Sequence, residues 1–230
     1  ATFLGDIVAG RSQISLADIA PIALLFTEYV AFAVKADSPL KTGRDLVARL
    51  KADSGSISTA ISGVIGNHNY IALALVTRAA GGDVKKLKVV TYNGGSDGIT
   101  AALGGHVDIV VAPAATILPH AQSGGLRMIA IAAPKRQSGP LADVPSTKEL
   151  GVNASLANWR VMIGPRGITP PQTAYWENVF ARVVETDEWK SMLARDSLTG
   201  EFLRSAETRV QLKTEYDEMK AIMTDFGLVK

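Results

Sequence analysis

The middle of the chain alternates short apolar runs with segments of helical character. We predict strands at residues 56–62, 86–92, 107–112 and 126–133. Helices are predicted between them, at residues 67–82, 97–103 and 115–125. Nearly continuous apolar strands that alternate with helices are typical of a parallel sheet covered on both faces. The pattern therefore predicts a doubly wound α/β domain, in which the strands are joined by right-handed crossovers.

The segment after residue 134 combines one strand with a run of helices. Ser146 and Glu149 match a capping box, which predicts a short helix that stops at Gly151. Thr169 and Gln172 match a second capping box, with proline at the first helical position. We predict a strand at residues 159–164 and helices at 172–185, 187–195 and 206–226.

Strand-like segments at both ends of the chain flank the central unit. Residues 1–6 are predicted as a strand that runs into a turn, and residues 17–36 as two apolar strands. The C-terminal helices must cover something outside the central unit, so we predict two α/β domains joined by two crossing strands. The first is discontinuous, with residues 1–34 and 158–230, and the second spans residues 35–157. We expect the first domain to be incomplete, because the chain opens within a strand.

Composition excludes several classes of function. The 24 basic and 22 acidic residues are interspersed and give a formal net charge of +2, and aromatic residues make up 6% of the chain. Such a chain lacks the basic patch and the stacking side chains of a nucleic-acid-binding protein. It has no cysteine, which excludes disulfides, thiolate metal sites and a cysteine nucleophile. Its longest apolar runs are far shorter than a membrane span.

Two glycine-containing loops follow predicted strands and lead into helices. Residues 62–70 read SGVIGNHNY, with Asn67 as the predicted N-cap, and residues 91–98 read TYNGGSDG. In open parallel sheets, ligands bind at the carboxyl ends of strands, where helix N-termini present free N–H groups. Neither loop contains Lys or Arg, which suits a carboxylate better than a polyphosphate. The alternative is that these glycines only shape strand-to-helix turns.

No motif typical of catalysis or metal binding is present. His106 and His120 have no neighbours at metal-ligand spacing, and we interpret them as surface or packing residues. His68 opens a helix, where it either contacts a ligand or has a structural role. Asp97 and Asp108 are the acids closest to the predicted ligand edge, and Asp97 is interpreted as stabilising the helix dipole. We therefore predict a protein that is not an enzyme and uses no metal or cofactor.

Trp159 and Arg160 lie where the chain is predicted to return to the first domain. The guanidinium fork of Arg160 suits the distal carboxylate of a dicarboxylate. It suits equally a pairing with an acid of its own domain. Both roles stay open, and both residues are candidates for ligand binding.

The loops and their order resemble the tripartite tricarboxylate transporter substrate-binding proteins, the TctC or Bug family. The resemblance rests on SGVIGNHN, VTYNGGSDGITAALGGHVDIVVA, GLRMIAIAAPKR, LADVPSTKELGV and ANWRVMIGPRGITPP, which together extend over essentially the whole chain. It implies a type II periplasmic-binding-protein fold that captures a small carboxylate for the membrane subunits of a secondary transporter. It further implies a periplasmic monomer with no membrane insertion of its own, whose signal peptide lies upstream and has been removed.

The resemblance also implies where the ligand is held, largely by loop backbone and two ordered waters. In the first domain it points to Gly5 and Asp6. In the second domain it points to Ser62, Gly63, Val64, Ile65, Gly66, Asn67, Asn69, Tyr92, Asn93, Gly94, Gly95, Pro113 and Ala114. The family's usual S-A-G-G-T-D-H is replaced here at Ile65, Asn67 and His68, and Asn93 stands where lysine is common. These departures affect the identity of the carboxylate more than its class.

Two other functions fit the same bilobal architecture. The effector domain of a transcriptional regulator would need a DNA-binding segment ahead of Ala1. A lyase or decarboxylase would need a convergent acid and base, for which His68 and Asp97 are the only candidates. We favour the receptor.

Overall fold

The computed structural model describes residues 2–229. Its internal contacts divide the chain into two compact units: unit 1 is Ala1–Glu28 with Asn158–Lys230, and unit 2 is Tyr29–Ala157. The chain passes between the units twice, once within strand β1 (Ile19–Lys35) and once at the start of β6 (Ala157–Pro165). The first passage follows Glu28 and so precedes the boundary that we place after residue 34 from the sequence.

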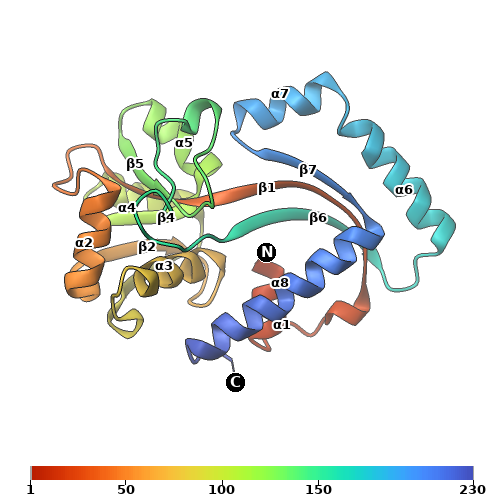
Figure 1. Cartoon of the computed structure of the whole chain (residues 1–230), viewed down its shortest axis with the longest axis horizontal. Coiled ribbons are helices and arrows are strands. Elements are labelled where there is room, and N and C mark those ends of the chain that lie inside the picture. The colour runs from red at the N-terminus through yellow and green to blue at the C-terminus, as the bar shows by residue number, and fades with distance from the viewer. Residues whose placement is uncertain (1, 230) are drawn as a thin grey trace. The chain divides into compact units, whose positions relative to one another are not determined.

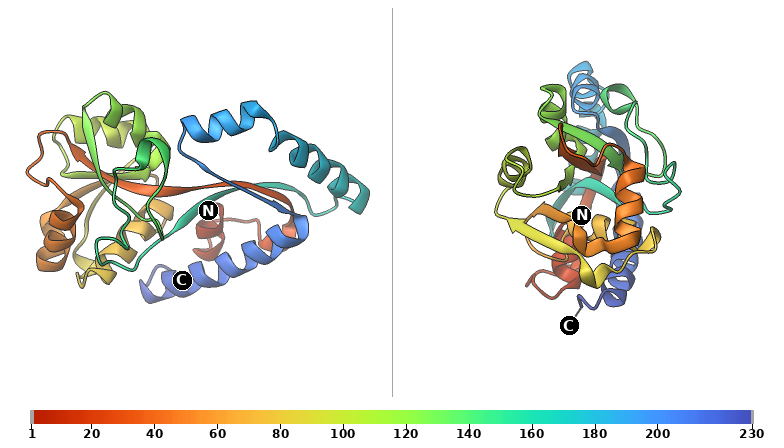
Figure 2. Two further views of the ribbon diagram at one scale, coloured as in Figure 1. Left: turned by 45° about the horizontal axis from the view of Figure 1, so that its top comes forward. Right: turned by 90° about the vertical axis from the view of Figure 1, so that its left-hand side faces the viewer.

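Unit 2 is built on a sheet with the strand order β3–β2–β4–β1–β5. Its strands are the second part of β1, β2 (Ser58–Ser62), β3 (Lys88–Tyr92), β4 (Ile109–Pro113) and β5 (Leu126–Ile131). Its helices are α2 (Gly43–Asp53), α3 (His68–Ala79), α4 (Gly95–Leu103) and α5 (Ala114–Gln122). Helices α2 and α3 cover one face of the sheet and α4 and α5 cover the other (Figures 1 and 2). The predicted alternation of strands and helices is confirmed.

The direction of two strand pairings differs from the prediction. Strand β2 pairs in parallel with β3 and β4, but β1 pairs antiparallel with β4 and with β5. The sequence pattern misses this because a strand buried on both faces is apolar along its length, whichever way its neighbours run. The sheet of unit 2 is therefore mixed rather than wholly parallel.

Strand β1 supplies the centre of the unit 2 core. Ala31 and Ala33 are fully buried in a cluster that includes Ile99 of α4 and Ile117 of α5. The intervening Phe32 is also fully buried, and side chains alternate between the two faces of a strand. The small side chains of Ala31 and Ala33 thus face the layer of α4 and α5, and the large side chain of Phe32 points to the other face of the sheet.

Unit 1 is organised around the first part of β1. This part pairs with β6 and, in antiparallel register, with β7 (Thr199–Arg204). Helices α6 (Pro170–Val183) and α7 (Asp187–Arg195) contribute to an apolar cluster on Ile22, Ala23 and Leu25. Helix α1 (Thr2–Val8) packs against the long helix α8 (Ser205–Asp225), and the two lie side by side in Figure 1.

Several local predictions are confirmed and others are wrong. The second capping box forms at Thr169 and opens α6, and the predicted bounds of α7 are those observed. The N-terminal strand predicted at residues 1–6 is wrong, because residues 2–8 form helix α1, with Leu4 and Val8 buried one turn apart; Ala1 lies outside the described residues. Helical spacing of two apolar residues in so short a segment does not distinguish a helix from a strand.

Two further differences concern the strand at residues 17–36 and the segment after Ser146. The predicted pair of strands at residues 17–36 is one continuous strand, β1, of 17 residues. The box at Ser146 forms, with its N–H donating to Glu149 at 2.9 Å, but the following residues make turns rather than a helix. Gly151, with φ of +82°, ends the segment after a single turn. Helix α2 and strand β7 are not predicted from the sequence.

We predict that Gly43→Ala destabilises unit 2 and that Gly98→Ala does not. A Cβ at Gly43 would lie 2.4 Å from the carbonyl oxygen of Ile129, so α2 must shift from β5, at a cost of about 2 kcal/mol. A Cβ at Gly98, inside α4, meets its neighbours at 3.5 Å or more, and alanine favours the helix by up to about 1 kcal/mol. Urea unfolding followed by circular dichroism measures both. Equal effects of the two changes would contradict the assigned close approach at Gly43.

Candidate ligand-binding loops

Three helices of unit 2 begin at one edge of its sheet. The register pairs Ser62 with Tyr92 and Ile61 with Val111, so the parallel strands β2, β3 and β4 end together. Each of these strands leads into a helix, α3, α4 or α5 respectively (Figure 1). A helix N-terminus carries N–H groups that no earlier carbonyl of the helix accepts, and it is the positive end of the helix dipole. The edge therefore concentrates hydrogen-bond donors and positive partial charge.

The first loop, residues 63–67, turns tightly on two glycines. Gly63 and Gly66 have φ values of +80° and +89°, a region that residues with a side chain rarely adopt. The N–H of Gly63 donates to the carbonyl oxygen of Tyr92 at 2.7 Å, which ties this loop to the end of β3. Val64 and Ile65, at the loop tip, are about half exposed. The loop thus has a fixed backbone and an apolar outer rim.

The first turn of α3 is polar and buried. Asn67, predicted as the N-cap, accepts the N–H of Tyr70 on its side-chain oxygen at 3.0 Å and donates to the carbonyl of Ser62. Asn69 donates to the hydroxyl of Ser62 at 3.3 Å. His68 lies between them and is 3% exposed. These contacts hold the amide groups in place at the helix entrance, and the predicted cap is confirmed.

The second and third loops lie close to one another. Asn93 is exposed, and Gly94 is the N-cap of α4, with its N–H donating to the carboxylate of Asp97 at 3.3 Å. A Cβ at Gly95 would lie 3.6 Å from the side chain of Thr116, in the first turn of α5. Asp97 therefore stabilises the start of α4, as the sequence suggests.

Pro113 and Ala114 form the third loop. Pro113 ends β4 and is the N-cap of α5, whose first residue, Ala114, is 3% exposed. Proline here fixes the backbone angle that turns the strand into the helix. Residues 62–70, 93–98 and 113–116 contain neither Lys nor Arg. An anion at this edge would thus be held by backbone donors, helix dipoles and amide side chains.

Gly5 and Asp6 do not form the loop that the sequence predicts. Both lie within α1 in unit 1, where Gly5 is buried and its carbonyl accepts the N–H of Ala9 at 2.9 Å. The carboxylate of Asp6 pairs with the guanidinium of Arg11 at 2.9 Å. Since the predicted opening strand is a helix, no loop follows it at this position.

Arg160 pairs with an acid of its own unit. Its guanidinium donates to Glu28, which is 6% exposed and also accepts the side-chain N–H of Asn158 at 2.9 Å. Arg160 lies over the ring of Phe26, 5.9 Å from its centroid. Burial raises the pKa of Glu28, and the charge of Arg160 offsets part of that rise. The sequence leaves two roles open for Arg160, and the one seen in the structure is the pairing with an acid of its own unit.

Trp159 packs within unit 1, and Asp108 pairs with Ser58 within unit 2. Trp159 is 6% exposed and belongs to unit 1, where it lines a small pocket with Phe3 and Leu212. Asp108 precedes β4 and accepts the N–H and hydroxyl of Ser58 at 2.7 and 2.6 Å. That pair lies at the amino ends of β2 and β4, so Asp108 is at the edge opposite the loops, contrary to the sequence-based placement. Asp108 comes before β4 in the chain, whereas the loops follow the carboxyl ends of the strands, so the two lie at opposite edges of the sheet.

The cluster of Glu28 and Asn158 is not predicted from the sequence. The feature of the sequence that could have revealed this cluster is the single glutamate inside the apolar run of β1, LLFTEYVAF, because a buried acid needs a partner.

The described part of the chain contains no group of three or more histidines or acids that could hold a metal ion. Within residues 2–229, no helix combines the length and apolar character needed to cross a bilayer.

Comparison with known proteins gives both sequence and structural relatives. A protein of Cupriavidus necator, "UPF0065 protein in gbd 5'region", is 27% identical over 197 residues, which cover 86% of this chain and 58% of the relative. The chain thus spans less than two thirds of that relative's length.

Two solved structures from Rhodopseudomonas palustris share the fold. MatC with bound malate superposes with a TM-score of 0.80 at 19% identity, over 96% of this chain and 76% of MatC. Rpa4515 with adipate also gives a TM-score of 0.80, at 18% identity, over 91% of this chain and 69% of that protein. These likenesses confirm the predicted α/β fold class. The family profile "Tripartite tricarboxylate transporter family receptor" matches residues 12–228, and the chain belongs to this TctC family.

Proposed function

We propose that the protein is an extracytoplasmic receptor that binds a small di- or tricarboxylate and delivers it to the membrane subunits of a tripartite tricarboxylate-type transporter. The observation that carries the proposal is the convergence of the α3, α4 and α5 N-termini at one sheet edge, without a basic side chain in their loops. Membership of the receptor family and the malate and adipate in the two related structures support the ligand class.

The chemistry of the edge favours carboxylates over other anions. Backbone N–H groups and dipoles supply partial positive charge, which suits groups of one charge each. A polyphosphate concentrates more charge and is typically met by Lys or Arg in addition. The apolar rim at Val64 and Ile65 suits a ligand with some hydrocarbon between its carboxylates.

The direct test is ligand-dependent stabilisation. Malate, adipate and citrate are each added to the protein, alongside malamide and adipamide, which keep the shape and lose the charge. Binding to the folded state raises the unfolding temperature with ligand concentration. We expect at least one acid to stabilise the protein and its amide to have no effect. If none of a broad panel of acids raised the unfolding temperature, or if acid and amide raised it equally, the proposal would be contradicted.

We predict that Asn69→Asp weakens carboxylate binding by about tenfold or more. The new charge sits in the first turn of α3, where it is favourable for the helix but repels an anion at the edge. Titration calorimetry measures the affinity and thermal unfolding the stability. Ala48→Glu, on the exposed face of α2, adds the same charge as a control and should bind normally. Unchanged affinity in Asn69→Asp would place the ligand elsewhere.

A further inference from the structure

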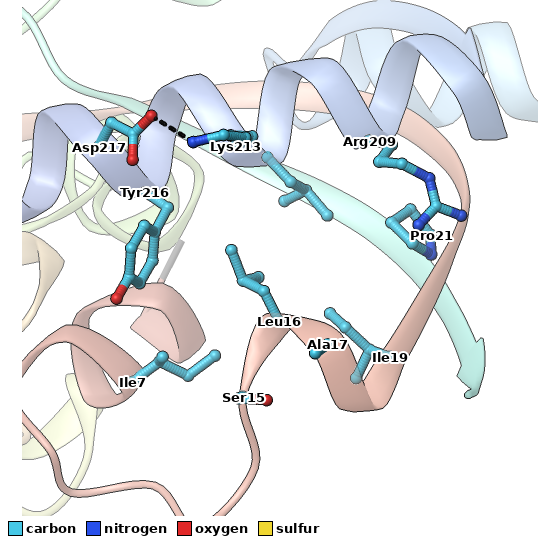
Figure 3. A pocket seen from close by; sticks show the side chains of 11 residues that line it. Ile7, Ser15, Leu16, Ala17, Ile19, Pro21, Arg209, Lys213, Tyr216 and Asp217 are labelled. Carbon is cyan, nitrogen blue, oxygen red and sulfur yellow. Dashed lines mark hydrogen bonds and ion pairs between the residues drawn. The ribbon is translucent and has the colours of Figure 1, made fainter.

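Unit 1 contains a pocket that the proposed function does not use. It has a volume of about 430 Å³ and lies between α8, α1 and the short helical turn η1 (Leu16–Asp18) with the start of β1 (Figure 3). All of its lining residues belong to unit 1, so it is formed without any contribution from the three loops of unit 2. Pockets of this size typically hold small organic molecules.

The floor of the pocket is apolar. Leu16 and Ile19 approach it from one wall and Ile7 from α1 (Figure 3). Leu212, in α8, also lines it. Leu212 is 4% exposed and belongs to the core of the unit. A ligand on this floor would remove apolar surface from water on both sides, which favours binding of a hydrocarbon group.

The charged groups stand along one face of α8. Arg209, Lys213 and Asp217 are spaced at four-residue intervals, so they follow one another along the rim of the pocket (Figure 3). Lys213 donates to Asp217 at 2.8 Å, and these two charges offset each other. Arg209 makes no ion pair with an acid anywhere in residues 2–229. The rim therefore keeps one positive charge.

We propose that this pocket binds a monocarboxylate with an apolar body, in addition to the ligand of the three loops. The hydrocarbon part would lie on Leu16, Ile19 and Leu212, and the carboxylate would accept hydrogen bonds from the guanidinium of Arg209. The two sites differ in chemistry, because the loops offer backbone donors and no basic side chain. A small hydrophilic diacid suits the loops, and an amphiphilic acid with a single charge suits the pocket.

Octanoate is a suitable probe, with octanamide as the uncharged analogue. Titration calorimetry on the 230-residue chain measures affinity, and ¹H–¹⁵N NMR spectra identify the amides that octanoate perturbs. We expect octanoate to bind, octanamide to bind at least about tenfold more weakly, and the shifts to lie on α8 and residues 15–21. Absence of octanoate binding, or shifts confined to unit 2, would overturn the proposal.

Two substitutions separate charge from shape. Arg209→Gln should weaken octanoate binding by about tenfold or more, and Ala17→Phe, which fills the pocket from its exposed side, should abolish it. Arg182→Gln, on the exposed surface of α6, removes the same charge outside the pocket and should leave binding unchanged. Equal loss in Arg182→Gln and Arg209→Gln would overturn the assignment of the carboxylate to Arg209.

The outcome is distinguishable from that of the proposed function. Arg209→Gln should leave the effect of malate or adipate unaltered, and Asn69→Asp should leave octanoate binding unaltered. Octanoate binding that is lost in Asn69→Asp and kept in Arg209→Gln would place octanoate at the loops of unit 2 and contradict the second site.

Discussion

Replacing Glu28 by alanine is expected to lower the free energy of unfolding of unit 1 by about 3 kcal/mol. The change leaves the buried side-chain N–H of Asn158 without its acceptor and removes the ion-pair partner of Arg160. Arg160 is itself partly exposed and can be solvated, which keeps the cost below that of a fully buried pair. Urea unfolding followed by tryptophan fluorescence measures the effect, since all three tryptophans, Trp159, Trp176 and Trp189, lie in unit 1.

Glu28→Gln is the matched control. The amide oxygen of glutamine can still accept from Asn158, so we expect a change within about 1 kcal/mol at neutral pH. A loss as large as that of alanine would show that the charge, rather than the hydrogen bond and the packing, stabilises the cluster. No loss with either substitution would contradict the role assigned to Glu28.

The control variant also has a defined pH dependence. The carboxyl of Glu28 ordinarily titrates near 4.5, and burial raises its pKa in the folded state, with Arg160 acting in the opposite direction. At a pH between the pKa of Glu28 in the unfolded chain and its higher pKa in the folded chain, the folded chain retains a proton that the unfolded chain has lost. The free energy of unfolding therefore falls as the pH rises through this window. Glu28→Gln should remove this pH-dependent part of the stability. Burial also raises the pKa of Glu215, so Glu215→Gln should remove a second pH-dependent part with the same sign.

Replacing Phe32 by alanine is expected to destabilise unit 2 by about 4 kcal/mol. Phe32 is 0% exposed and lies in β1, between β4 and β5, opposite Val111 of β4 and Ala130 of β5. The shorter side chain removes buried apolar surface and leaves a cavity among side chains that are fixed by the sheet on both sides. Far-ultraviolet circular dichroism during urea unfolding measures the change, because unit 2 contains no tryptophan.

Phe32→Leu separates the cavity from other effects. It keeps an apolar side chain of intermediate volume, and we expect it to cost less than half as much as alanine. A loss below about 1 kcal/mol for Phe32→Ala would mean that the space closes by movement of the surrounding strands, and would contradict a tightly packed centre.

The two proposed sites would give the protein two independent ways of recognising acids. At the loops of unit 2, the backbone of tight turns would supply the donors, so a side-chain substitution there should act mainly through the turn geometry or through added charge. At the pocket of unit 1, a single guanidinium and an apolar floor would carry the recognition, so truncation of Arg209 should act directly. Comparing the two kinds of substitution separates the sites.

Much of unit 2 follows from local sequence. The apolar runs of β2, β3 and β4, the cap at Asn67 and the glycines at Gly63 and Gly94 together predict strands that end in loops and enter helices. Each of these signals concerns interactions between residues close in sequence, such as a side chain that accepts an N–H two or three residues ahead. Two of the three candidate loops therefore follow the strands after which the local sequence predicts them, and the third, at Pro113 and Ala114, is predicted only from the family resemblance.

The tertiary structure alone decided what depends on partners distant in sequence. Apolar strands do not reveal the direction of their neighbours, so the antiparallel pairing of β1 was not predicted. The pairing of Arg160 with Glu28 joins residues 132 positions apart. Likewise, the pocket along α8 requires the N-terminal segment to pack against a helix near the other end of the chain. Local sequence determined the elements and their turns, and long-range packing determined which side chains share a site, because burial and pairing are properties of the folded chain as a whole.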